Sequence, residues 1–173
     1  GSFGLSKEPA RSATVWAMKT AKELGRLVSF DVNYRDTVWE SEREAIETVD
    51  SILDTVDFLK ISEEELKFVG GEANIPAFMK EHDITAVIET LGADGARYFF
   101  GENRGHVPGQ KVKAVDATGA GDAFWGGFLS RLLMSGVCAV KEVTEEIVRA
   151  SLEYGNASGG LCVQKMGGIP ALP

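Results

Sequence analysis

The sequence has few of the residues on which several kinds of site depend. It contains two cysteines and two histidines among 173 residues, too few for a disulfide scaffold or a metal centre built from several histidines. Basic residues are outnumbered by acidic ones, 18 to 26, so the net charge is -8. A general binder of nucleic acid or anionic membranes needs a surplus of positive charge. We therefore expect a cytoplasmic protein that binds neither nucleic acid nor membranes.

Long hydrophobic runs are also absent. The most apolar stretch, residues 123–140, is interrupted by Ser130 and Arg131. It falls short of the roughly 20 apolar residues that a membrane span needs, and we expect a buried helix there. The N-terminus begins with Gly1 and lacks the apolar core of a signal peptide. With 44% hydrophobic and 25% charged residues, the composition is typical of a folded chain, which we interpret as one domain over residues 1–173.

The motifs of several large enzyme classes are missing. The chain has no G-x-x-x-x-G-K-[ST] loop and no G-x-G-x-x-G after a strand, so the motifs of Walker-type nucleoside triphosphatases and of the usual dinucleotide-binding site are absent. H-E-x-x-H, paired C-x-x-C and G-x-S-x-G are absent too. Hydrolase and zinc-enzyme interpretations therefore lose their main support.

The hydrophobic pattern alternates between helices and strands. Apolar residues recur at helical spacing over residues 8–24 and 45–56, and short apolar runs predict strands over 27–30, 58–61, 85–91 and 96–100. Strands separated by helices indicate an α/β fold with a largely parallel sheet, and the closeness of the last two strands predicts an antiparallel hairpin at an edge. Ligands of such sheets bind beyond the carboxyl ends of the strands. The loops of interest therefore begin at Asp31, Ser62, Thr90 and Asp116.

The first predicted helix depends on small apolar residues. Apolar side chains recur at Ala10, Ala13, Ala17, Ala21 and Leu24, with Met18 beside them, and Gly25 is placed to end the helix. We expect Trp16, Trp39 and Trp125 in the core or in a pocket wall.

The segment most suggestive of chemistry is V-D-A-T-G-A-G-D-A-F, residues 115–124. Its small residues allow backbone N–H groups to converge on an anion at the start of a helix, where the helix dipole favours negative charge. Asp122 lies in the first turn, where it either caps the helix or accepts a proton from an attacking hydroxyl during phosphoryl transfer. The residues alone leave both interpretations open.

This segment closely resembles the C-terminal signature of the PfkB carbohydrate kinases, the ribokinase and fructokinase family. Four further segments resemble the family in the same order: F-D-V-N-Y-R with a downstream Trp39, I-S-E-E-E-L in place of N-x-x-E, T-L-G-A-D-G, and N-A-S with the ending G-G-I-P-A-L-P. The resemblance implies a three-layer ribokinase-like (Rossmann-like) fold and an ATP-dependent kinase that phosphorylates a primary hydroxyl of a sugar. Fructose is the preferred substrate, with 2-keto-3-deoxygluconate kinase or ribokinase as alternatives. A non-catalytic relative that acts as a binding or scaffold protein is the alternative of another class.

The resemblance also implies roles for individual residues. Asp122 is the expected catalytic base, and the N–H groups of Gly119, Ala120 and Gly121 form the expected anion hole for developing charge. The residues expected to contact ATP are Thr90, Gly92, Gly95, Gly121, Asn156 and Ser62. A simple hairpin turn is the alternative for residues 90–95.

Asp31, Asn33 and Arg35 are the expected sugar-binding residues, together with Asp122. Because they alternate along the chain, an extended backbone would point all three to one side. The alternative is a polar loop with a local Asx turn.

Metal sites are implied at two places. Glu65 would organise Mg²⁺ through water, although S-x-x-E before a helix is also a capping box. Members similar to ribokinase bind a monovalent cation, and here the corresponding K⁺ site would involve Asp116 and Thr118 with backbone near Cys162, Lys165, Gly167 and Ala171.

The five matching segments begin about midway along family members. We therefore expect that an N-terminal portion, including the lid, is missing from this chain and would be its partner, that the complete protein is a homodimer, and that the isolated chain is inactive. The expected ligands are ATP, Mg²⁺, possible K⁺ and a small sugar.

Overall fold

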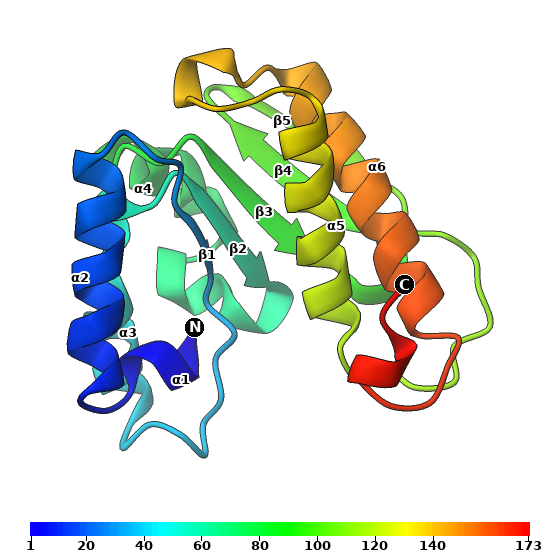
Figure 1. Cartoon of the computed structure of the whole chain (residues 1–173), viewed down its shortest axis with the longest axis horizontal. Coiled ribbons are helices and arrows are strands. Elements are labelled where there is room, and N and C mark those ends of the chain that lie inside the picture. Colours follow the sequence, from blue (N-terminus) through cyan, green and yellow to red (C-terminus); the bar gives the residue numbers. More distant parts are fainter. The chain divides into compact units, whose positions relative to one another are not determined.

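The computed structural model describes residues 1–173, whose contacts divide into two compact units. Unit 1 comprises residues 1–88 and 99–102, and unit 2 comprises residues 89–98 and 103–173. Five strands form one sheet in chain order (Figure 1): β1 (Ser29–Asp31), β2 (Phe58–Ser62), β3 (Ala86–Thr90), β4 (Ala96–Phe100) and β5 (Asn103–Val107).

Helices and short 3₁₀ turns connect the strands. The α-helices are α1 (Ser2–Leu5), α2 (Ala10–Glu23), α3 (Glu42–Asp50), α4 (Ile75–Glu81), α5 (Ala120–Met134) and α6 (Glu145–Cys162). The 3₁₀ turns are η1 (Leu53–Thr55), η2 (Glu63–Val69), η3 (Glu72–Asn74), η4 (Gly92–Asp94), η5 (Val140–Glu142) and η6 (Ile169–Ala171). No helix is both long enough and apolar enough to cross a bilayer.

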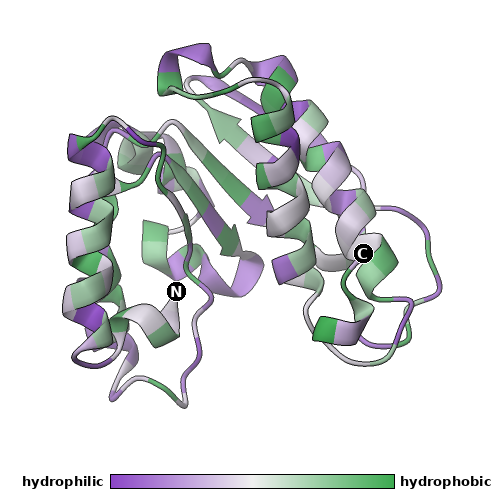
Figure 2. Ribbon diagram, viewed as in Figure 1, coloured by the Kyte–Doolittle hydropathy of each residue, from purple (hydrophilic) through white to green (hydrophobic).

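The centre of unit 1 is a buried parallel pair. β1 and β2 run parallel, with Ser29 opposite Phe58 and Asp31 opposite Lys60. The first four residues of β2 are buried, as is typical of parallel strands covered on both faces. Figure 2 shows the same hydrophobic character along β3, which turns hydrophilic at its carboxyl end. The polar residues at the carboxyl ends of these strands therefore lie next to the loops that follow.

Helix α2 (Ala10–Glu23) confirms the helix predicted over residues 8–24. It ends before Gly25, whose φ of +65° is the expected left-handed termination. Met18 is its buried residue, whereas Ala13 and Ala17 are exposed and Leu24 is 67% exposed. Alanine buries little area, so the larger Met18 decides which side of the helix packs.

Four sequence predictions were wrong in part. The helix predicted over 45–56 ends at Asp50 and is followed by η1. The predicted edge hairpin is followed by a further strand, β5, which was not predicted because its polar sequence has no strand pattern. Trp16 is 69% exposed, whereas Trp39 and Trp125 are buried as predicted. The stretch predicted to be one buried helix ends at Met134, and Leu133 and Met134 on it are exposed.

Helices α5 and α6 pack closely in unit 2. A Cβ on Gly127 of α5 would overlap the hydroxyl of Ser158, and one on Gly155 of α6 would lie 2.9 Å from the Phe124 carbonyl oxygen. The two glycines therefore set how near the helices approach. This contact fixes the first turn of α5, where Asp122 lies, relative to the end of α6.

Candidate active site

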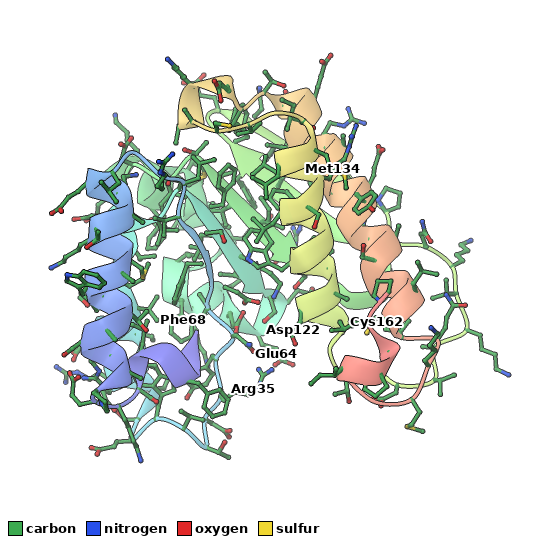
Figure 3. All side chains as sticks on the ribbon, in the orientation of Figure 1. Arg35, Glu64, Phe68, Asp122, Met134 and Cys162 are labelled. Carbon is green, nitrogen blue, oxygen red and sulfur yellow. The ribbon has the colours of Figure 1, made fainter.

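The first turn of α5 presents Asp122 beside a group of backbone donors. Gly119 is the N-cap residue with a φ of +79°, a left-handed conformation that favours glycine. The first N–H groups of a helix have no intrahelical acceptor, so they are free for an anion or a nearby carbonyl. Ala120 donates to the Ala117 carbonyl oxygen at 3.1 Å. Its N–H would have to leave that carbonyl to join the predicted anion hole. Asp122, which Figure 3 shows at the start of α5, is exposed.

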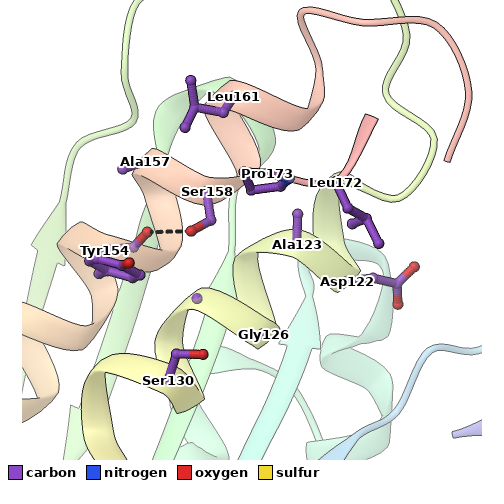
Figure 4. Close-up of a pocket in the computed structure, with 11 residues that line it drawn as sticks. Asp122, Ala123, Gly126, Ser130, Tyr154, Ala157, Ser158, Leu161, Leu172 and Pro173 are labelled. Carbon is purple, nitrogen blue, oxygen red and sulfur yellow. Dashed lines mark hydrogen bonds between the residues drawn. The ribbon is translucent and has the colours of Figure 1, made fainter. Parts of the chain in front are cut away.

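A groove of about 460 Å³ runs between α5 and α6 from Asp122 (Figure 4). Most of its lining side chains are small or apolar: Ala123, Gly126, Gly127, Ser130, Tyr154, Ala157, Ser158, Leu161, Leu172 and Pro173. Asp122 is the charged side chain among the lining residues. None of them is basic, so within this groove a phosphate beside Asp122 would meet hydroxyls and the backbone N–H groups of the first helical turn.

The residues of the predicted K⁺ site lie together in unit 2. One oxygen of Asp116 accepts from the N–H of Thr118 at 2.9 Å and from its hydroxyl at 2.7 Å, and the other accepts from the Gly167 N–H at 2.8 Å. The bonds from Thr118, followed by the Gly167 N–H, lower the pKa of Asp116. Its carboxylate therefore stays ionised and ties the loop before α5 to the loop after α6.

The other residues of the predicted K⁺ site differ in how close they lie to Thr118 and in how exposed they are. The Cys162 thiol lies 3.6 Å from the Thr118 carbonyl oxygen, and Ala171 packs with Cys162 against Ala123. The Lys165 side chain is exposed, and its N–H donates to the Cys162 carbonyl oxygen. No group of three or more His, Cys, Asp or Glu side chains is placed to hold a metal ion. Any cation here has to be bound largely by backbone oxygens.

The predicted nucleotide loop, residues 90–95, is a tight turn between β3 and β4. Its ends are joined by the Leu91 N–H, which donates to the Gly95 carbonyl oxygen at 2.8 Å. A Cβ on Gly95 would overlap the Val107 carbonyl oxygen, whereas one on Gly92 would meet nothing within 4 Å. Gly95 is thus required for packing, and Gly92 leaves an open approach to the backbone.

Asn156 supports this loop indirectly. Its side chain is buried, and its amide nitrogen donates to the carbonyl oxygens of Val107 at 3.0 Å and Pro108 at 3.2 Å. The same segment packs against Gly95. The structure therefore places Asn156 behind the predicted nucleotide loop, where it orders the backbone on which the loop rests.

In unit 1, the D-x-N-x-R segment is a loop and not an extended strand. Asp31 accepts from the Asn33 N–H at 3.1 Å, and Asn33 has a φ of +43°. The prediction that alternation points all three side chains to one side was wrong, because this Asx turn breaks the extended backbone. Arg35 is exposed, and its guanidinium donates to the Tyr34 carbonyl oxygen at 2.9 Å.

Lys60 is a partner of Asp31 that the sequence pattern did not reveal. Its ammonium lies 2.7 Å from the second Asp31 oxygen, and both side chains are largely buried. Burial raises the pKa of Asp31, and the nearby Lys60 opposes that effect. The sequence does contain one signal of this pair, a lysine inside the otherwise apolar run F-L-K-I, because a buried lysine requires a partner of opposite charge.

Glu65 connects two predicted site segments of unit 1. It is 6% exposed, and its oxygens accept from the N–H of Tyr34 at 2.6 Å and the N–H of Ser62 at 2.8 Å. The contact with Ser62 belongs to the predicted capping box, although the helix that follows is the 3₁₀ turn η2. Glu65 therefore holds the start of η2 against the loop that contains Asn33 and Arg35.

Comparison with known proteins places this arrangement in a family. A model described as pfkB family carbohydrate kinase matches residues 4–173. The chain belongs to the pfkB carbohydrate kinase family. It is 41% identical over 177 residues to probable fructokinase-5 of Arabidopsis thaliana, covering 100% of this chain and 54% of that protein. It is 40% identical over 179 residues to fructokinase-1 of Oryza sativa subsp. japonica, with the same coverage of 100% and 54%. The pfkB chain thus spans about half the length of these curated relatives.

Solved structures confirm the predicted ribokinase-like fold. A fructokinase from Vibrio cholerae O395, in a form bound to fructose, ADP and calcium ion, superposes with a TM-score of 0.89 at 34% identity, covering 99% of this chain and 56% of that one. An engineered double mutant of that fructokinase was solved with fructose, ADP and potassium ion. Aminoimidazole riboside kinase from Salmonella enterica superposes with a TM-score of 0.87 at 31% identity, covering 99% and 57%.

Proposed function

We propose that the protein containing this pfkB chain is an ATP-dependent fructokinase, with Asp122 as its base. The observation that carries this proposal is an exposed carboxylate in the first turn of α5, next to a left-handed Gly119 and the N–H groups of a helix N-terminus. A carboxylate beside an anion-binding site repels phosphate, so its presence there indicates a catalytic role. In phosphoryl transfer, that role is to accept the proton of the attacking hydroxyl. The relatives named fructokinase favour fructose as the acceptor.

The proposed reaction transfers the γ-phosphoryl group to a primary hydroxyl. The hydroxyl oxygen forms the new bond to phosphorus, the bond to the β-phosphate oxygen breaks, and ADP leaves with the bonding electrons. Asp122 orients the hydroxyl and takes its proton late, because a sugar hydroxyl is far less acidic than a carboxylic acid. The N–H groups at the start of α5 stabilise the charge on the transferred group, and the Ala120 N–H joins them once it leaves the Ala117 carbonyl oxygen. In the same reaction we assign Asn33 and Arg35, with Asp31, to the sugar, and Thr90, Gly92, Gly95 and Ser62 to ATP.

The residues present fit the two cations to different degrees. Mg²⁺ commonly binds through one or two carboxylates, waters and substrate phosphates. Each oxygen of Glu65 already accepts one N–H, so contact with Mg²⁺ through a water suits this residue. When bound, Mg²⁺ neutralises phosphate charge. The ionised Asp116, in a loop rich in backbone oxygens, fits a monovalent cation such as K⁺ that screens charge near the helix start. The homodimeric state and the cytoplasmic location stay predictions.

A panel of acceptors tests the proposed function. The complete gene product that carries this chain is assayed for ADP release with fructose, 2-keto-3-deoxygluconate, ribose and no sugar. We expect the largest kcat/KM with fructose. A higher value with either of the other acceptors would move the assignment to that kinase. ATP binding without turnover on any acceptor would instead favour the non-catalytic relative.

A further inference from the structure

The buried hydroxyl of Ser2 is not explained by any of the roles assigned above. Ser2 begins α1 and is 3% exposed. Its Oγ donates to the Asn33 carbonyl oxygen at 2.9 Å and accepts from the Arg35 N–H at 3.0 Å and from the Trp39 indole N–H at 2.9 Å. A serine hydroxyl has one donor and two acceptor positions, so these bonds use its full capacity.

These three contacts surround the part of unit 1 that we assign to the sugar. They join residues separated by 31 to 37 positions in the chain. The Asn33 backbone is in the left-handed region, which asparagine tolerates better than most non-glycine residues but at some cost in strain, so the bonds around it help to hold this conformation. Asp31 holds the Asn33 N–H, Glu65 holds the Tyr34 N–H, and Ser2 holds the Asn33 carbonyl and the Arg35 N–H. Every peptide link between Asn33 and Arg35 is thereby tied to a side chain.

The start of the chain is packed tightly against the same loop. A Cβ on Gly1 would overlap the Val32 carbonyl oxygen and lie 2.8 Å from the Cβ of Asn33. The Arg35 guanidinium is exposed, whereas the Arg35 backbone N–H is held by the Ser2 hydroxyl. We propose that Ser2 is a positioning residue for sugar binding: its hydroxyl sets the loop from Asn33 to Trp39 so that Arg35 meets the acceptor sugar. This inference rests on the proposed function.

The test uses Ser2→Ala in the complete gene product. The variant leaves one carbonyl and two N–H groups without their partner, which we expect to loosen the loop and raise the sugar KM about tenfold. The KM for ATP should stay within about twofold, and amide hydrogen exchange over residues 33–39 should accelerate. Ser2→Thr keeps the hydroxyl and should restore most of the affinity. Ser51→Ala is the control, because it removes an exposed hydroxyl bonded only locally, to the Thr48 carbonyl oxygen.

A double-mutant cycle separates positioning from general stability. If Ser2 acts through Arg35, Ser2→Ala should add little to the sugar KM in an Arg35→Ala background. Faster exchange with an unchanged sugar KM, while Arg35→Ala alone raises it, would overturn the role of Ser2. No effect of Arg35→Ala on the sugar KM would overturn the assignment of this loop to the sugar, and the role of Ser2 with it. If Ser2→Ala does not fold, Ser2→Cys, with a similar size and a weak donor, takes its place in the same measurements.

Discussion

Removal of the Glu65 carboxylate separates its contribution to the fold from its proposed contribution to Mg²⁺. Glu65→Ala eliminates two hydrogen bonds to a carboxylate at a position that is 6% exposed. Each bond to a charged group contributes about 1.5–3 kcal/mol, so the free energy of unfolding should fall by about 3–6 kcal/mol. That is a large fraction of the roughly 5–15 kcal/mol that stabilises a domain. With a urea m-value of about 1–3 kcal/mol/M, the unfolding midpoint should fall by more than about 1 M.

The adjacent Glu64 provides the matched control. It lies in the same first turn of η2 but is exposed, so Glu64→Ala should change the free energy of unfolding by no more than about 0.5 kcal/mol. Glu65→Gln should give an intermediate loss, since an amide has one oxygen to accept one of the two N–H groups. An unfolding midpoint for Glu65→Ala equal to that of Glu64→Ala would refute the structural role. If only the Mg²⁺ concentration for half-maximal activity then changed, Glu65 would act through the metal alone.

Three further changes test unit 2. Asp122→Asn should lower kcat by about 10²–10⁴-fold with ATP affinity nearly unchanged, as measured by steady-state kinetics and calorimetry, and retained turnover would remove Asp122 as the base. Gly95→Ala should lower the unfolding temperature more than Gly92→Ala and raise the KM for ATP, because only the first added Cβ overlaps the backbone at Val107. Folding lowers the pKa of Asp116, so its stabilisation is present above the ordinary pKa of an aspartate and is lost as the pH falls through the lower folded value. The unsubstituted protein should therefore unfold at a higher temperature than Asp116→Asn, and this difference should shrink below about pH 4. A difference that does not depend on pH would contradict the ionised carboxylate.

Local sequence determined the elements whose signals are local. The strands β2 and β4 and the end of α2 at Gly25 lie where the apolar runs and the glycine predicted them. The capping residues Ser62 and Glu65 lie at the predicted start of η2, since both belong to one turn. The family could also be predicted, because five short motifs in a fixed order carry more information than any one of them. Asp122 lies in the first turn of α5 for the same reason: glycine before an apolar helical pattern begins a helix.

Tertiary structure decided the features that depend on residues about 30 positions apart. Nothing local indicates that Lys60 pairs with Asp31, that Glu65 holds the Tyr34 N–H, or that the Ser2 hydroxyl holds Asn33 and Arg35. Each of these side chains is polar and buried, and a buried polar group persists only where the fold supplies its partner. The D-x-N-x-R motif therefore predicted which residues form the loop. The Asx turn between Asp31 and Asn33 is local, whereas the distant side chains of Glu65 and Ser2 hold the backbone that follows it in place.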